Sequence, residues 1–361
     1  MIRKSLITMY FLSVVSLSLY AAENKATDEK KPIGIDFFTE VKGISNLKEK
    51  DGNIFFILSK PDKENDNYTR DLYQLIDGKA VRLTTSKNVS DYFFLNDGIA
   101  FRNIREDKDR EKVRKGEQLT VFQKLSQGFQ EATEWLRLPY SVGNIELIDE
   151  EHFFFTVSYD HQFATWLEES NGNFQDALKK KEENKDYRIL YELPFWSNGR
   201  GDVSGLRTHL YYYGKGEIKP LSDNVFENVS SLELSPNKKT LVFAKREYYG
   251  KAPQGNQLIS LNTETFERKE WSLFEKASYG GVQFLNDNEV VLTINRSLER
   301  NKNENAGFYR LNLQSGNVTQ IYDGSIYGLG NSIGSDIKSG GSSKITFDKE
   351  GIRYVSTVVD Q

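Results

Sequence analysis

Residues 328–334 have the sequence Gly-Leu-Gly-Asn-Ser-Ile-Gly, which places Ser332 in the Gly-x-Ser-x-Gly pattern of a hydrolase nucleophile. Such a serine needs an apolar strand before it and a helix after it, but both flanks here are rich in glycine and serine. The hydrolase order also requires a later histidine. His152, His161 and His209 all come earlier. We therefore expect a loop here and no catalytic residue in the chain.

The glycines of the same segment also resemble a dinucleotide-binding loop, but no strand-helix-strand unit surrounds them. We expect no cofactor. His152 opens a phenylalanine-rich strand and His209 lies in a tyrosine-rich one, so packing or rim positions are favoured for both. His161 lacks the spaced partners that a metal site needs. The chain has no cysteine, so we expect no thiolate metal site and predict no metal.

Trp196, Asn198 and Arg200 are the candidates for a binding site, because together they could line a pocket. The alternative is structural: Phe195 and Trp196 would pack into a sheet, and the Asn-Gly pair that follows would form a turn. Residues 200–202 also spell the adhesion tripeptide Arg-Gly-Asp, but matches of three residues arise by chance. The sequence favours the packing interpretation over the binding one.

The N-terminus has the organisation of a secretory signal peptide. Arg3 and Lys4 precede an apolar run that ends in small residues at Ala21 and Ala22. We predict a signal peptide over residues 1–21, a flexible segment over 22–35 and an exported protein, periplasmic or extracellular, that is not in the membrane after cleavage. An uncleaved anchor is the alternative, although the run is short for a membrane span.

Composition indicates a packed globular protein. Aromatic residues make up 13% of the chain, and there are only 7 prolines. The formal net charge is −4 and becomes more negative when the leader is removed, and no basic stripe appears. This charge disfavours a nucleic-acid partner. Without cysteine there are no disulfides, so an exported fold must depend on its hydrophobic core.

One unit recurs along most of the chain. It begins with a turn and an alternating apolar strand, and most copies continue with a second strand, a tight turn and a third strand. The six openings are at 51, 96, 150, 237, 286 and 349. Groups of about four antiparallel strands in series predict an all-β fold, a β-propeller of four-stranded blades. A β-sandwich is the alternative, but it gives no reason for the repetition.

Two segments interrupt the repeat. Residues 163–187 are rich in helix formers and charge, with Phe174, Ala177 and Leu178 spaced for one apolar face. They predict a helical insertion between strands of the third blade. Residues 107–115 alternate acidic and basic side chains, which we interpret as a solvated loop.

The segment 193–223 and the strand after it carry a resemblance to a known family. Its elements are Pro194-Phe195-Trp196, Asn198-Gly199, His209-Leu210-Tyr211 and, as a blade turn, Ser235-Pro236-Asn237. With these, residues 36–359 resemble the propeller portion of the prolyl oligopeptidase family of serine peptidases, on the acylaminoacyl-peptidase-like branch.

The resemblance implies that this chain has a non-catalytic function. In that family the propeller covers a C-terminal α/β-hydrolase domain that holds the catalytic Ser, Asp and His. The chain would be the substrate-gating portion of an exported serine peptidase, truncated before any hydrolase domain. Its partners would be a peptide substrate or a separately encoded hydrolase half. The alternative is a free-standing periplasmic propeller that binds a peptide, glycan or protein.

The blade count predicts an incomplete propeller over 36–361, with five blades and part of another. An unclosed propeller leaves an unpaired strand edge. Three outcomes follow: the ends pair in a smaller ring, a second polypeptide supplies strands, or the reading frame is truncated. The sequence favours the third.

Overall fold

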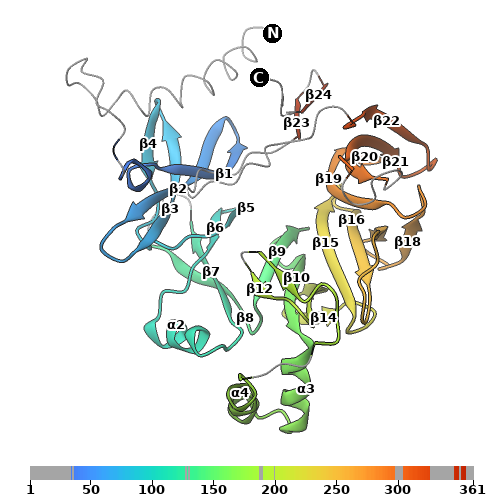
Figure 1. Cartoon of the computed structure of the whole chain (residues 1–361). Coiled ribbons are helices and arrows are strands. Elements are labelled where there is room, and N and C mark those ends of the chain that lie inside the picture. The colour runs from blue at the N-terminus through green and yellow to red at the C-terminus, as the bar shows by residue number, and fades with distance from the viewer. Residues whose placement is uncertain are drawn as a thin grey trace. The chain divides into compact units, whose positions relative to one another are not determined.

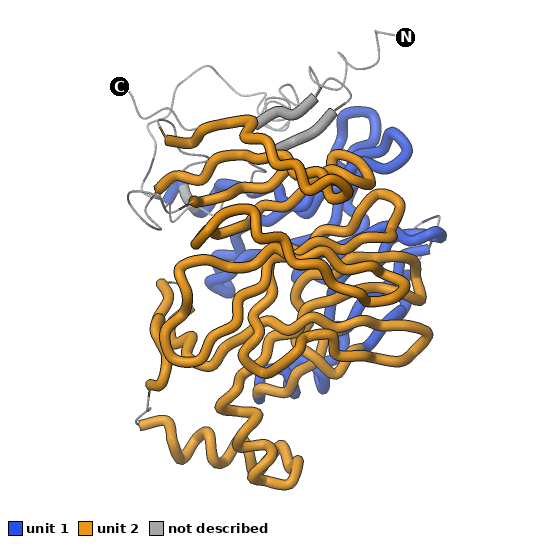
Figure 2. The backbone as a smooth tube through the Cα atoms, turned by 90° about the vertical axis from the view of Figure 1, so that its right-hand side faces the viewer, with its two compact units in different colours: residues 1–115, 121–137, 333–342 blue, residues 116–120, 138–332, 343–361 orange. Residues whose placement is uncertain are grey.

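The computed structural model describes residues 34, 36–126, 128, 131–186, 190–198, 200–296, 304–325, 345–348 and 351–354. The described part divides into two compact units (Figure 2). The first unit holds the described residues up to Lys115 together with Val121–Arg137, and the second holds Gly116–Thr120 and the described residues from Leu138 onward. Each unit is built from four-stranded antiparallel sheets.

The first unit contains two of these sheets, each with its strands in chain order (Figure 1). The strands are β1 (Gly43–Lys50), β2 (Asn53–Asp62), β3 (Asn67–Ile76) and β4 (Lys79–Arg82), followed by β5 (Tyr92–Leu95), β6 (Gly98–Arg102), β7 (Thr120–Leu125) and β8 (Thr133–Leu138). A short 3₁₀ helix, η1 (Phe37–Thr39), precedes β1, and helix α2 (Asp107–Arg114) connects β6 to β7.

The second unit contains three four-stranded sheets and two small two-stranded ones among the described residues. The third blade has the order β14-β13-β10-β9, from β9 (Val142–Leu147), β10 (His152–Asp160), β13 (Leu206–Gly214) and β14 (Glu217–Pro220). The fourth and fifth blades comprise β15 (Glu227–Leu234), β16 (Thr240–Glu247), β17 (Gln257–Asn262) and β18 (Arg268–Trp271), then β19 (Ser278–Asn286), β20 (Glu289–Asn295), β21 (Gly307–Asn312) and β22 (Val318–Tyr322). The small sheets pair β11 (Trp196–Ser197) with β12 (Gly201–Asp202), and β23 (Ile345–Asp348) with β24 (Gly351–Tyr354).

The repeat seen in the sequence corresponds to the second, third and fourth strands of each blade. Its opening strands are β2, β6, β10, β16, β20 and β24, and the first strand of each sheet precedes the opening turn. The turn at Asp51-Gly52 has φ of 52° and 80°, and that at Lys215-Gly216 has 51° and 90°. Two successive positive φ values are those of the tight hairpin turns that match strand twist. The turns expected in the repeat are therefore present at both positions.

In the second unit, successive sheets pack on one another through both faces, as in a propeller. In β16, Leu241 and Phe243 face a core shared with Phe154 and Leu210 of the third blade. Val242, between them in sequence, faces the opposite core with residues of the fifth blade. Alternate residues of a strand point to opposite faces, so one strand supplies two cores. The expected all-β, β-propeller fold with five four-stranded blades is confirmed.

The helical insertion lies where the sequence places it, between β10 and β13 of the third blade (Figure 1). It consists of α3 (His161–Glu169) and α4 (Phe174–Glu183). The Asp160 carboxylate caps α3 by accepting the backbone N–H groups of Gln162 and Phe163 at 3.1 and 3.2 Å. The rings of Phe163 and Phe174 meet edge to face at 5.4 Å, and Ala177 is buried. An apolar contact therefore joins the two helices.

The interpretation of residues 107–115 as a solvated loop is wrong, because most of this run forms helix α2. Asp109 is buried on the helix, and its carboxylate accepts a 2.8 Å hydrogen bond from Arg137 of β8. Asp107 and Asp109 lie in the first turn and Lys112 and Arg114 in the last, which suits the helix dipole. The ion pair with Arg137 stabilises this helix, and the local charge pattern could not reveal it because Arg137 lies far along the chain.

Several predictions concern residues outside those described. They are the signal peptide over 1–21, nearly all of the segment 22–35, and the glycine-rich segment with Ser332. Within the described part, no helix is long and apolar enough to cross a membrane.

Candidate ligand-binding pocket

A pocket of about 250 Å³ lies in the second unit, and Trp166, Tyr191 and Tyr249 are among the residues that line it. We call it the aromatic pocket, lined by His161, Gln162, Thr165, Trp166, Tyr191, Glu192, Ser204, Gly205 and Tyr249. Helix α3 supplies the first four, which share one helical face because positions i, i+1, i+4 and i+5 lie side by side. The other five come from three further segments of the chain.

The segment that carries Tyr191 is held extended against the loop after β16. The Leu193 N–H donates to the Gly250 carbonyl at 2.8 Å, and the Leu193 carbonyl accepts from the Ala252 N–H at 2.8 Å. Side chains therefore alternate along it: Tyr191 is 62% exposed, Glu192 is buried and Leu193 is 57% exposed. The same backbone pairing brings Tyr191 beside the loop that bears Tyr249.

Glu192, which lines the aromatic pocket, belongs to a buried ion pair. Arg207 of β13 donates from Nη2 to Glu192 Oε1 at 2.5 Å and from Nη1 to Oε2 at 3.2 Å, and the Gly205 N–H donates to Oε2 at 2.9 Å. The guanidinium also stacks on the Tyr248 ring, 4.1 Å from its centroid. Because Arg207 balances the Glu192 charge, this part of the pocket is electrically neutral.

Helix α3 is fixed at the pocket by its first residue. The His161 N–H donates to the Gly205 carbonyl at 3.0 Å, and Gly205 has φ of +74° with the His161 Cβ just 3.6 Å from where its own Cβ would lie. A side chain at position 205 would therefore be strained by the positive φ, while its Cβ would be in ordinary contact with the helix. The His161 ring contacts Phe226 at 5.6 Å, and Phe226 contacts Tyr249 at 5.3 Å. These ring contacts connect helix α3 to the loop that bears Tyr249.

The other two histidines take the positions expected of them. His209 is buried and stacks on Tyr159 at 4.4 Å, and burial lowers the pKa of its imidazole. His152, at the start of β10, lies 2.9 Å from the Asp149 carboxylate. Among the described residues, no group of three or more His, Cys, Asp or Glu side chains is arranged to hold a metal ion.

The three candidate residues from the sequence lie on the β11–β12 hairpin beside the aromatic pocket and do not line it. Trp196 is 60% exposed and its ring lies over Gly201. Asn198 and Arg200 are exposed in the turn, which the Arg200 N–H closes by donating to the Ser197 carbonyl at 3.1 Å. The expected turn is present. The expected packing of Phe195 and Trp196 into a sheet is wrong, since both side chains are exposed.

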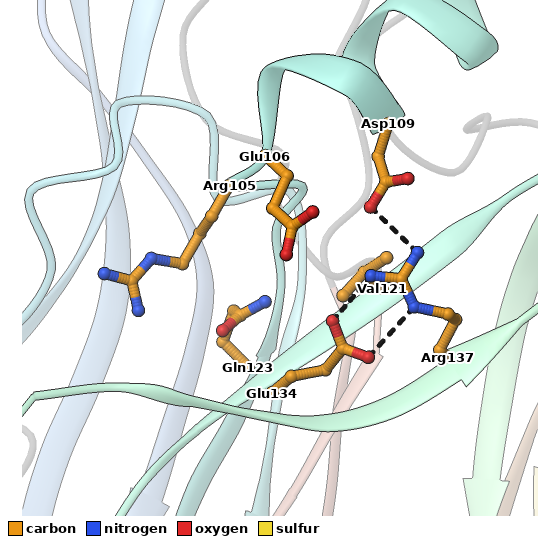
Figure 3. Close-up of a pocket in the computed structure, with 7 residues that line it drawn as sticks. All are labelled: Arg105, Glu106, Asp109, Val121, Gln123, Glu134 and Arg137. Carbon is orange, nitrogen blue, oxygen red and sulfur yellow. Dashed lines mark hydrogen bonds and ion pairs between the residues drawn. The ribbon is translucent and has the colours of Figure 1, made fainter.

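A second hollow, of about 200 Å³, lies in the first unit (Figure 3). We call it the ion-paired hollow, lined by Arg105, Glu106, Asp109, Val121, Gln123, Glu134 and Arg137. Figure 3 shows the Arg137 guanidinium between two carboxylates, and it lies 2.8 Å from Asp109 and 2.7 Å from Glu134. These bonds raise the pKa of Arg137 above its usual value. Arg105 pairs with Glu131 at 3.2 Å, so the cationic groups here already have anionic partners within the protein.

Sequence reasoning missed Trp166, Tyr191 and Tyr249. One usable signal was the Tyr-Glu-Leu triplet at 191–193, in which a carboxylate stands between two large apolar residues. In an extended segment this order either buries the charge and exposes the apolar pair, or exposes the charge and buries the pair. Here the buried arginine allows the first arrangement. Tyr249 has no such local signal.

Comparison with known proteins shows similarity in structure alone. Neither a family model nor a curated protein matches the sequence. An acylaminoacyl peptidase from Pyrococcus horikoshii is 14% identical with a TM-score of 0.56, over 81% of this chain and 41% of that one. An acylaminoacyl peptidase in complex with Z-Gly-Gly-Phe-chloromethyl ketone is 13% identical with a TM-score of 0.58, over 89% and 47%. A puromycin-hydrolyzing peptidase of Mycobacterium tuberculosis is 10% identical with a TM-score of 0.53, over 87% and 43%.

The chain therefore spans less than half the length of each of these peptidases. At such low identity the match establishes the fold and not the activity. The resemblance inferred from the sequence is confirmed at that level: this chain has a propeller fold that matches part of the acylaminoacyl peptidases.

Proposed function

We propose that this chain is a non-catalytic propeller that binds peptides and positions them for a serine-peptidase catalytic domain. The observation that carries the proposal is the structural match to three peptidases over 81–89% of this chain and 41–47% of theirs. The part of those proteins that it resembles is the propeller. The catalytic α/β-hydrolase domain would be a partner, encoded with this chain or separately.

The surface around the aromatic pocket supports a binding role. Tyr191, Leu193 and Tyr249 are large apolar side chains that are exposed on adjacent, hydrogen-bonded segments here. Exposed apolar groups gathered in one place are typical of interaction sites. This feature also supports the second candidate function, a free-standing propeller that binds a peptide, glycan or protein partner.

Peptide binding separates the proposed function from the glycan-binding form of the alternative, and it is measurable with the purified chain. We expect fluorescein-labelled, N-acetylated decapeptides to raise their fluorescence anisotropy with this protein, while labelled oligosaccharides of similar mass do not. Binding of the oligosaccharides alone would favour the free-standing glycan-binding alternative and contradict the proposal. A mixed-sequence decapeptide pool serves as the first probe.

A separate part of the proposal is that this chain has no peptidase activity of its own. We expect no labelling by a fluorophosphonate probe and no amidase activity. Labelling that Ser332→Ala abolishes would show that the chain carries its own nucleophile.

Export is also part of the proposal and stems from the N-terminal pattern of Arg3, Lys4 and the apolar run. Expression of the full chain with a C-terminal tag should yield periplasmic or secreted protein that begins near Glu23. Recovery of tagged protein that retains residues 1–21 in the membrane fraction would favour the anchor alternative.

A further inference from the structure

We propose that the aromatic pocket of the second unit binds one uncharged aromatic side chain of a peptide ligand. This inference rests on the proposed function for the peptide nature of the ligand. It adds the site, which is distinct from the hairpin residues predicted from the sequence, and the class of side chain that the site accepts.

The size of the pocket limits the ligand to a single group. Its volume of about 250 Å³ is below the ~300–1,000 Å³ that is usual for sites enclosing a whole small molecule. A side chain can enter while the backbone that carries it stays outside. Leu193, 57% exposed, lies on the same outward side of its extended segment as Tyr191 and offers apolar surface beside the opening.

The walls favour an aromatic group. Trp166, Tyr191 and Tyr249 come from three separate segments and line the same pocket. Aromatic rings attract one another in edge-to-face and offset-stacked arrangements, worth ~0.5–1.5 kcal/mol beyond the area they bury. Tyr191 and Tyr249 remain 62% and 63% exposed, so a ligand ring would cover surface that the fold leaves in water.

The charge distribution selects a neutral group. Glu192 is the carboxylate that lines the pocket, and its two oxygens already accept bonds from Arg207 and the Gly205 N–H. A ligand cation would gain little from a carboxylate already paired with an arginine, and a ligand carboxylate would be repelled by it. An uncharged ring loses the least hydration on entering such a site.

The test uses amino-acid amides, which contain the side chain without a peptide. The probe is N-acetyl-4-fluoro-L-phenylalanine amide, titrated with the purified full chain and followed by ¹⁹F NMR line broadening. We expect saturable binding that N-acetyl-L-phenylalanine amide displaces. We also expect N-acetyl-L-aspartic acid amide and N-acetyl-L-lysine amide to compete at least about ten-fold more weakly, because they carry charge.

Matched variants locate the binding. Tyr191→Ala with Tyr249→Ala should weaken binding by at least about ten-fold, whereas Tyr191→Phe with Tyr249→Phe keeps the rings and should stay within about two-fold. Trp196→Ala removes an aromatic side chain that is equally exposed but outside the pocket, and should also stay within about two-fold. The far-UV spectrum and melting temperature of each variant establish that it is folded.

The outcomes distinguish this inference from the proposed function. No saturable binding, equal competition by the aspartic acid amide, or equal loss in Trp196→Ala would each overturn the inference. If decapeptides bind and the double alanine variant binds them unchanged, the proposed function stands and the pocket assignment fails. If the aromatic amide binds in the pocket and no peptide competes, the pocket assignment stands and the peptide-binding function fails.

Discussion

The two hollows of this protein differ in whether the side chains that line them already have partners within the protein. In the ion-paired hollow of the first unit, Arg137 lies between Asp109 and Glu134, and the charges satisfy one another. In the aromatic pocket of the second unit, the one ion pair is placed behind the wall and the rings of Tyr191 and Tyr249 remain exposed to water. The first arrangement holds helix α2 on its sheet, whereas the second keeps apolar surface available to a ligand.

The largest expected effect comes from breaking the ion pair behind the aromatic pocket. Arg207→Ala leaves the Glu192 carboxylate buried without its cation and should lower the free energy of unfolding by about 3–5 kcal/mol. Urea denaturation measures this change. The double variant Arg207→Met with Glu192→Leu removes both charges and should recover most of the loss. A double variant as unstable as the single one would show that the pair contributes more than charge balance.

The second effect comes from Glu233, a partly buried carboxyl that has another carboxylate nearby. Burial and the nearby Glu146 carboxylate raise the pKa of Glu233 in β15 to about 8, from an ordinary value of 4.5. A raised carboxyl pKa means that the folded state holds its proton more tightly than the unfolded chain does. Glu233 therefore costs no stability below about pH 4.5, and the penalty grows as the pH rises toward 8.

Glu233→Gln removes this titration while keeping the shape of the protonated side chain. Its advantage in free energy of unfolding over the unmodified protein should rise from near zero at pH 4.5 to about 3 kcal/mol at pH 7, at ~1.4 kcal/mol for each pH unit. Urea denaturation at four pH values measures the difference. An advantage that is independent of pH would mean that Glu233 is ionised in the folded protein throughout.

In the ion-paired hollow the expected loss is smaller. Asp109→Asn keeps the side-chain size but removes one of the two carboxylates that hold Arg137, which is itself partly exposed. Because Glu134 still pairs with Arg137, we expect a loss of only about 1 kcal/mol. Hydrogen exchange should show faster opening of α2 with β16 unaffected. A loss as large as that of Arg207→Ala would remove the distinction between the two ion pairs.

The smallest effect on stability is expected at the pocket rings. Tyr191→Ala and Tyr249→Ala each remove a side chain that is mostly exposed. The free energy of unfolding should change by no more than about 0.5 kcal/mol in each variant, with a correspondingly small change in melting temperature. A large loss at either position would mean that the ring belongs to the core of the fold and that its exposure is not a binding feature. Differential scanning calorimetry is sufficient for this comparison.

The sequence predicted the parts of this fold that depend on local pattern. The alternation of strand residues and the turns between strands depend on short segments of sequence. The same is true of the amphipathic spacing within residues 163–187, where α3 and α4 form. Helix α2 was missed because its stability depends on Arg137, far along the chain from Asp109. The local charge pattern of 107–115 is the same for a solvated loop and for a helix with such a partner.

The candidate site was predicted less well, for the same reason. The aromatic pocket joins α3, the 191–192 segment, the Ser204-Gly205 turn and Tyr249, which no sequence window contains together. Trp196, Asn198 and Arg200 were chosen from the neighbouring hairpin because their types are suited to binding. Only the backbone pairing of Leu193 with the loop at 250–252 reveals which aromatic residues meet.

The extended backbone at 191–193 means that the number of residues in this segment determines which side chains face the surface. Because side chains alternate inward and outward and the pairing of Leu193 fixes the register, gaining one residue between Glu192 and Leu193 would turn the tyrosine toward Arg207 and the glutamate toward water. Homologues with an indel at this point should thus differ in what they recognise even where every neighbouring amino acid is retained.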